Sequence, residues 1–182
     1  SDIVTRAAGT EDSRLGRIML FMYENKGKDQ SQNKLLGYRI FLNSNEGTVN
    51  NEEDGFWTGE GNEGRLNFYA YPGDVYIYLL GNVTGSFLKY FPGMQSEEEL
   101  KGLTDQEKFF QAVRPTWTGN FNMTDGYLPL AGSVNNSTAA CRIGEDGTVT
   151  YMDDATGTTR IDSINNPFLL KRLMAKISFT FK

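Results

Sequence analysis

The residue types that most often carry catalysis are sparse in this chain of 182 residues. It contains no histidine, and Cys141 is its single cysteine. The lack of histidine excludes Ser-His-Asp and Cys-His catalysis, most zinc sites and the usual proton shuttle. A lone cysteine also rules out an internal disulfide and a cysteine metal cage. We therefore expect no catalytic residues, no metal site and no cofactor, and we interpret Cys141 as a small buried side chain.

Carboxylates are the remaining groups that could do chemistry. Three acidic clusters occur, at residues 52–54, 97–99 and 153–154. None has the alternating spacing and terminal glutamate of an EF-hand loop, and the middle cluster fits the first turn of a helix, where the dipole favours negative charge. Two carboxylates that meet only in space could still hydrolyse a glycosidic bond, so a hydrolase remains an open alternative.

Aromatic side chains in loops offer another kind of chemistry, which is stacking on a sugar ring. Trp57 and Trp117 both fall in or near predicted loops. Aromatic residues of β-proteins more often anchor the core or a loop, and both interpretations stay open. We keep the two tryptophans as candidate contacts for a glycan or a host protein.

Strand patterns dominate the chain that must position these groups. Residues 17–23 are apolar on both faces, which predicts a central or doubly covered strand, and residues 35–42 form a second strand. Residues 65–71 and 75–80 lie on either side of a Pro-Gly-Asp turn, so we predict that they form a hairpin. We also predict a short strand near Trp57 and a short hairpin across residues 145–147.

The C-terminal residues show the cleanest alternation, with one apolar and one polar face. The apolar face holds Ala175, Ile177, Phe179 and Phe181, which predicts a half-buried strand. Residues 96–113 are the one helical pattern, with Ser96 and Glu99 as a capping box and Gly102 weakening the centre. Several short strands and one helix predict a mainly β fold, an antiparallel β-sandwich with one helical insertion.

Net charge narrows the possible partners. The formal charge is −5, with 18 basic and 23 acidic residues, which argues against nucleic acid and against an anionic lipid surface as a partner. A membrane-spanning helix needs a run of about 18 apolar residues, and no such run occurs. A binding or structural protein is the class that the composition favours.

Four segments, in order along the chain, resemble the fimbrillins, the type V pilins of Bacteroidetes. Residues 5–12 (TRAAGTED) precede a strand at residues 16–23 (GRIMLFMY), as in the processing region of that family. Residues 71–82 (YPGDVYIYLLGN) are similar to its turn-and-strand element. Residues 128–132 (LPLAG) are similar to its Leu-Pro-Met-Ser/Ala-Gly element, with Leu130 in place of the methionine. Residues 170–178 (LKRLMAKIS) resemble the strand that closes its N-terminal domain.

The resemblance implies a transthyretin-like β-sandwich and a function in assembly. Residues 1–13 would be the processing segment with the remnant of a removable strand, which includes Ile3 and Val4. Residues 14–182 would be the N-terminal domain, with the second domain of the family absent. An arginine-specific protease would cut between Arg6 and Ala7. A neighbouring subunit would then fill the groove by β-strand addition, and the groove would be lined by Ile18, Leu20, Met22, Ala175, Ile177 and Phe179.

The same resemblance implies a structural subunit of a cell-surface fimbrium, as a shaft, tip or anchor component, made as an outer-membrane lipoprotein precursor. Its partners would be other fimbrial subunits and the processing protease, and it would not be an enzyme. The alternative is a surface lipoprotein that binds a glycan or a host protein through loop aromatics such as Trp57 and Trp117.

Overall fold

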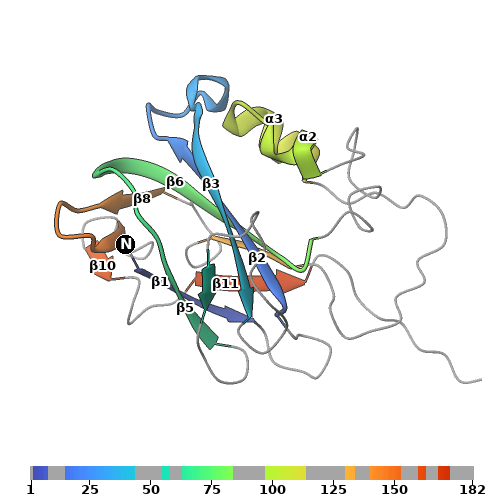
Figure 1. Cartoon of the computed structure of the whole chain (residues 1–182). Coiled ribbons are helices and arrows are strands. Elements are labelled where there is room, and N and C mark those ends of the chain that lie inside the picture. Colours follow the sequence, from blue (N-terminus) through green and yellow to red (C-terminus); the bar gives the residue numbers. More distant parts are fainter. Residues whose placement is uncertain are drawn as a thin grey trace, which may run out of the picture.

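The computed structural model of the chain describes residues 2–7, 15–43, 55–57, 63–83, 97–113, 130–133, 140–152, 160–162 and 168–172. Within this part the fold is mainly β, as predicted, and the strands form one eleven-stranded sheet (Figure 1). Its pairings are antiparallel except for β1 with β11 and β3 with β4. The strands are β1 (Asp2–Ala7), β2 (Arg17–Glu24), β3 (Leu35–Asn43), β4 (Gly55–Trp57), β5 (Glu63–Asn67), β6 (Gly73–Gly81), β7 (Leu130–Ser133), β8 (Ala140–Ile143), β9 (Val149–Met152), β10 (Arg160–Asp162) and β11 (Phe168–Arg172).

Strand β2 is central and covered on both faces, which confirms its prediction. It pairs with β3 on one edge and with β6 on the other. Because successive side chains of a strand point to opposite faces, β2 supplies two separate cores. One face contributes to an inner core of Leu15, Ile18, Leu20, Met22, Phe41, Leu66, Phe68, Val75, Ile77, Leu79, Cys141, Ile143, Val149, Tyr151 and Leu170. The other contributes to a helix-side core of Met19, Phe21, Tyr23, Ile40, Tyr78, Leu80, Val83, Leu100, Phe109 and Ala112.

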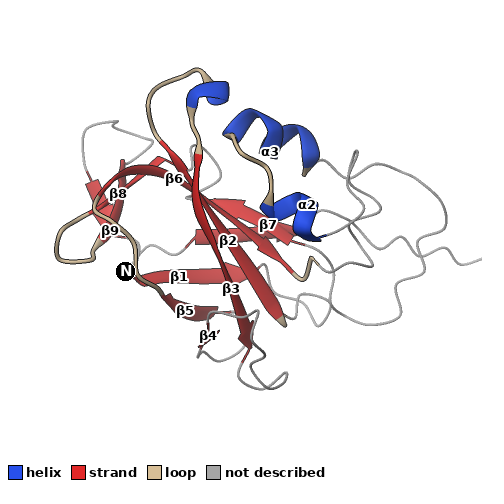
Figure 2. Cartoon of the chain, turned by 45° about the horizontal axis from the view of Figure 1, so that its top comes forward, coloured by secondary structure: helices blue, strands red, loops and turns tan. Residues whose placement is uncertain are grey.

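Strand β6 divides the sheet into two branches. One edge of β6 pairs with β2, while the other pairs with β8 near the start of β6 and with β7 near its end. From β8 the sheet continues to β9 and β10, and from β7 it continues to β11, β1 and β5. Strands β4 and β5 come close together, so the sheet curls around the inner core. The helices α2 (Glu97–Lys101) and α3 (Gln106–Ala112) cover the opposite face (Figure 2).

The predicted hairpin between residues 65–71 and 75–80 is wrong. Strand β5 pairs with β1, and β6 pairs with β2, β7 and β8. Strand β5 exposes Arg65 and Asn67 on one face, whereas residues 75–81 of β6 are covered on both faces. A doubly covered strand belongs in the middle of a sheet, and a strand with one wet face fits the outer layer. Residues 68–72 therefore cross between layers, with Phe68 buried in the inner core.

The predicted single helix over residues 96–113 is two helices. After Lys101 the chain turns at Gly102, whose N–H is donated to the carbonyls of Glu98 and Glu99. Helix α3 then starts anew, with the Asp105 carboxylate accepting the Lys108 N–H at 2.9 Å as an N-cap. The break frees the Thr104 carbonyl to accept the Leu35 N–H of β3 at 2.9 Å. The interruption therefore fastens the helices to the sheet.

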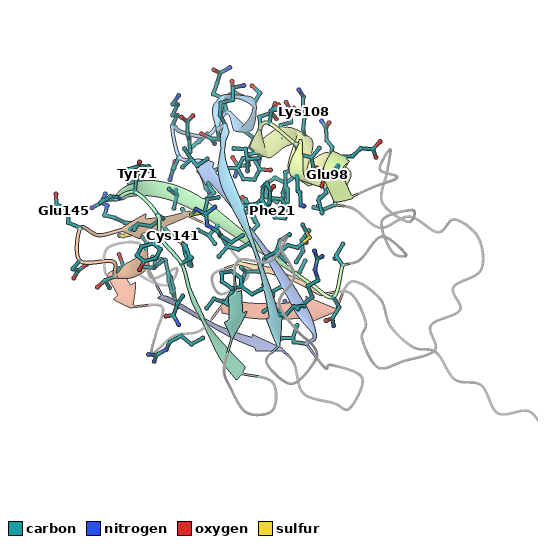
Figure 3. All side chains as sticks on the ribbon, viewed as in Figure 1. Phe21, Tyr71, Glu98, Lys108, Cys141 and Glu145 are labelled. Carbon is teal, nitrogen blue, oxygen red and sulfur yellow. The ribbon has the colours of Figure 1, made fainter. Side chains whose placement is uncertain are left out.

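Rings and buried amides hold the helices on the sheet. The Phe109 ring lies 5.1 Å from Phe21, 5.4 Å from Tyr23 and 5.2 Å from Tyr78, measured between centroids. Figure 3 shows Phe21 beneath the helices that carry Glu98 and Lys108. The Gln106 amide donates to the Tyr78 hydroxyl at 2.6 Å and accepts from the Asn33 amide at 2.7 Å. Burial raises the pKa of both Tyr23 and Tyr78 above that of an exposed tyrosine.

Other predictions have mixed outcomes. The hairpin across residues 145–147 is confirmed by the antiparallel pair β8–β9, and the strand near Trp57 is confirmed by β4. Cys141 is buried in the inner core, as predicted. The predicted C-terminal strand, with Phe181, lies outside the described residues, as does Ser96. No helix in the described part of the chain is long and apolar enough to cross a membrane.

We predict that Phe109→Ala lowers the free energy of unfolding by about 3–5 kcal/mol, because a fully buried ring would leave a cavity against Phe21, Tyr23 and Tyr78. Urea unfolding followed by circular dichroism measures the change. Phe110→Ala is the matched control, since its ring is only half-buried and its loss should cost clearly less. Equal costs for the two substitutions would contradict the assigned packing.

Candidate strand-exchange site

The N-terminal strand β1 lies inside the sheet, between β5 and β11 (Figure 1). It pairs antiparallel with β5 from Asp2 opposite Asn67 to Arg6 opposite Glu63. It pairs parallel with β11 from Thr5 opposite Phe168 to Ala7 opposite Leu170. A strand near one end of the sequence is thus paired along both edges. We call the space that β1 fills between β5 and β11 the β1 slot.

Alternation along the neighbouring strands defines an inner and an outer face of the β1 slot. Position 3 lies opposite Leu66, position 5 opposite Gly64 and position 7 opposite Leu170, and these three neighbours are buried. Arg65, opposite position 4, is exposed. Directly opposite residues of paired strands share a face. Positions 3, 5 and 7 therefore belong to the core face of the β1 slot, and positions 2, 4 and 6 to the outer face.

The predicted cleavage bond between Arg6 and Ala7 lies within β1. Arg6 is paired with Glu63 on one side and with Leu169 on the other, and Ala7 is paired with Leu170. A protease must bind the extended backbone around the bond that it cuts, so a bond inside a paired strand is protected until the strand opens locally. Cleavage at this bond would require β1 to leave the β1 slot first.

The predicted groove residues of β2 lie in the inner core rather than at the edges of the β1 slot. Both edges of β2 are occupied by β3 and β6, so Ile18, Leu20 and Met22 make no strand pairing with β1. They share the inner core with Leu66 and Leu170, the buried neighbours of β1. Ala175, Ile177 and Phe179 lie outside the described residues.

Sequence reasoning missed Gly64, Leu66 and Leu170 as residues that line the β1 slot. The signal for β5 was the alternation of buried Gly64, Leu66 and Phe68 with exposed Arg65 and Asn67, which predicts one covered face. It does not say which strand lies alongside. The pairing partner was the missing information.

A backbone clasp fixes the chain where it enters β2. The Gly16 N–H is donated to the Asn82 side-chain oxygen at 2.8 Å, and the Asn82 N–H is donated to the Arg17 carbonyl at 2.8 Å. The Arg17 guanidinium donates to the Val83 carbonyl at 3.1 Å. Asn82 has a φ of 58°, a left-handed conformation that asparagine tolerates well. Because Leu15 is buried as well, the chain is anchored from residue 15 onward.

The candidate ligand-binding tryptophans are not brought together in the described part. Trp57 ends β4 opposite Asn43, and Trp117 lies outside the described residues. The most exposed aromatic residues of the described part are Tyr69 and Tyr71, each 93% exposed, between β5 and β6. The Arg39 guanidinium donates to the Tyr69 carbonyl at 3.3 Å and supports this segment. Sequence reasoning placed both tyrosines in a strand and missed their exposure.

Charged groups of the described part form ion pairs and turns rather than a reactive cluster. The Arg142 guanidinium donates to both Asp74 carboxylate oxygens, at 2.7 and 3.2 Å, and this pair holds β8 to β6 at the surface. The Thr148 N–H, donated to the Asp146 carboxylate, lowers the pKa of Asp146. A group of three or more His, Cys, Asp or Glu residues suited to a metal ion is not found among the described residues.

Comparisons with known proteins identify no family. No family model matches the chain, and no curated protein matches it. Among solved structures, the chain is similar to a fimbrial assembly protein from Parabacteroides distasonis, with 13% sequence identity and a TM-score of 0.35. The similarity covers 72% of this chain and 46% of that one, so the chain spans about half the length of the solved structure.

We predict that Asn82→Ala costs about 2 kcal/mol of stability, because it removes the bond to Gly16 and replaces asparagine by a residue that tolerates positive φ less well. Asn82→Gly should cost about 1 kcal/mol, since glycine adopts this backbone conformation readily and the bond to Gly16 is still lost. Urea unfolding gives both values, and hydrogen exchange should show faster exchange of the Gly16 amide in both variants. Unchanged exchange at Gly16 would refute the clasp.

Proposed function

We propose that this chain is a structural subunit of a cell-surface fimbrium, as a shaft, tip or anchor component, and that it is not an enzyme. Assembly would proceed by proteolytic removal of β1 and β-strand addition from a neighbouring subunit. One observation carries the proposal, which is that strand β1, with the proposed cleavage bond, lies between β5 and β11. The four sequence segments similar to fimbrillins support the same role.

Loss of β1 would leave backbone groups without hydrogen-bond partners and apolar side chains without cover. The backbone edges of β5 and β11 that face β1 would lose their hydrogen-bond partners, at about 1–3 kcal/mol for each group that stays buried and unpaired. Leu66 and Leu170, now buried, would lose cover on the inner core. A chain with an empty β1 slot therefore has a strong tendency to take up another strand.

An incoming strand can restore this pairing only in one orientation. It has to run antiparallel to β5 and parallel to β11, as β1 does. Main-chain hydrogen bonds then supply affinity, and alternate side chains supply register. When the strand comes from the next subunit, the contact is head to tail and propagates into a filament.

The clasp at Asn82 makes such an exchange compatible with a folded subunit. It holds Gly16 and Arg17 through hydrogen bonds that involve no residue of β1. The release of residues 1–6 would therefore leave the start of β2 in place. In this proposal the chain derives from an outer-membrane lipoprotein precursor, and its partners are other fimbrial subunits and an arginine-specific protease that cuts between Arg6 and Ala7.

Ligand binding by exposed aromatics is the second candidate function. Tyr69 and Tyr71 are both 93% exposed, and they stand two residues apart in the segment between β5 and β6. Figure 3 shows Tyr71 at the outer edge of the molecule, near the start of β6. Exposed rings of this kind can stack on a sugar or contact a host protein. In this role the tyrosines take the place that sequence reasoning gave to Trp57 and Trp117.

We predict that limited digestion with an arginine-specific protease, in urea below the unfolding transition, cuts the bond between Arg6 and Ala7. A labelled peptide with the sequence of residues 1–6 should then be taken up into the β1 slot, because release of β1 leaves two unpaired edges. Mass spectrometry locates the cut, and fluorescence anisotropy measures uptake of the peptide.

Arg6→Gln is the matched control for this experiment, since it removes the cleavage site and keeps the strand. It should stay uncut at this bond and take up little peptide. Equal uptake by the two proteins, or no uptake by the cut protein, would contradict the strand-exchange proposal.

For the second candidate, we predict that a glycan array probed with the full chain shows a saturable signal that Tyr69→Ala and Tyr71→Ala each reduce at least tenfold. Leu36→Ala is the control, because Leu36 is an exposed apolar residue outside this segment. A signal that survives both tyrosine substitutions would count against binding through this segment.

A further inference from the structure

The outer face of the β1 slot carries the exposed side chains of Arg65 and Asn67 of β5. Glu63 lies opposite position 6, Arg65 opposite position 4 and Asn67 opposite position 2. Arg65 is exposed on this face, while its neighbours Gly64 and Leu66 are buried. A strand in the β1 slot therefore has a basic side chain opposite position 4 and an amide opposite position 2.

We propose that the β1 slot selects its strand by charge, and that it prefers an acidic residue at position 4, opposite Arg65. This inference rests on the proposed function, since it names the chemistry of the strand that a neighbouring subunit would supply. The favoured occupant is an extended segment with an apolar residue at position 3 and an acidic residue at position 4.

The resident strand matches this pattern at position 3 and departs from it at position 4. Ile3 occupies the position opposite the buried Leu66. Position 4 holds Val4, which brings no negative charge to the place opposite Arg65. Asp2 lies opposite Asn67, two residues from the position opposite Arg65, so Asp2 and Arg65 are diagonal neighbours on the two strands. Diagonal neighbours in an antiparallel pair are about 7–8 Å apart, against about 5 Å between the Cβ atoms of directly opposite residues.

The missing charge at position 4 would make the resident strand bind less tightly than a competing strand with an acidic residue there. An acidic residue directly opposite Arg65 would add a cross-strand pair of opposite charge, and such pairs change an equilibrium constant by about two- to fivefold. The pair is exposed, so added salt should weaken it. An incoming strand with Glu or Asp at position 4 would thus bind more tightly than the strand that it replaces.

The first test is a double-mutant cycle in the intact chain. Val4→Glu and the uncharged, isosteric Val4→Gln are each made alone and together with Arg65→Gln, and urea unfolding gives the four folding equilibrium constants. When Arg65 is present, we expect the folding equilibrium constant of Val4→Glu to exceed that of Val4→Gln about two- to fivefold. This difference should vanish with Arg65→Gln or in 1 M salt. Equal constants for Glu and Gln with Arg65 present would overturn the inference.

The second test uses the full chain cut between Arg6 and Ala7. Labelled peptides with the sequence of residues 1–6 and Val, Gln or Glu at position 4 compete for the β1 slot. We expect the Glu peptide to bind about two- to fivefold more tightly than the Gln peptide, and the advantage to disappear in Arg65→Gln.

The two tests separate the inference from the proposed function. If all three peptides bind with equal affinity, strand exchange stands and charge selection is overturned. If no peptide binds while the cycle in the intact chain shows coupling to Arg65, exchange fails and the preference of the β1 slot for an acid at position 4 is supported.

Discussion

The architecture depends on a pair of strands, β2 and β6, that have apolar side chains on both faces. Neither strand can face water on either side, so the sheet needs two covers. Six consecutive residues of β2 are buried, and they alternate between the inner core and the helix-side core. Burial of a large apolar side chain contributes about 1.5–3 kcal/mol, so both covers are needed for a stable fold.

The two covers differ in kind. The helix-side cover is held by the Phe109 ring cluster and by the chain of amides and hydroxyls through Asn33, Gln106 and Tyr78. Buried side-chain polar atoms of the described part all have partners, so this cover is satisfied internally. The inner cover is built from short strands, and β1 connects β5 to the rest of the sheet within the described residues. The structure therefore combines a firmly attached face with one that depends on strand β1.

Sequence patterns predicted what each segment buries better than what it pairs with. The doubly covered β2, the buried Cys141 and the hairpin β8–β9 follow from local alternation and turn residues, and all were predicted. The predicted hairpin of β5 with β6 was wrong, because alternation is the same whichever strand lies alongside. The helix break shows a local conflict, in which Gly102 and the capping residue Asp105 outweigh the apolar stripe through Leu100 and Phe109. For the site, Ile3 and Val4 were predicted to belong to a removable strand, and they lie in β1, but the neighbours of β1, Leu66 and Leu170, could be found only from the register.

The order of the strands along the chain bears on how the β1 slot is built. Strand β1 comes first in the sequence, yet its parallel partner β11 begins only at Phe168. Pairing across so long a separation is a non-local contact with a loop-closure cost. The parallel edge of the β1 slot exists only where β11 is paired with β7, and β5 pairs with no strand but β1 among the described residues. The pairings from β7 through β6 to β2 and β3 do not involve β1. The exchange that we propose would therefore replace the pairings of β1 by equivalent ones and would leave the helix-side cover untouched.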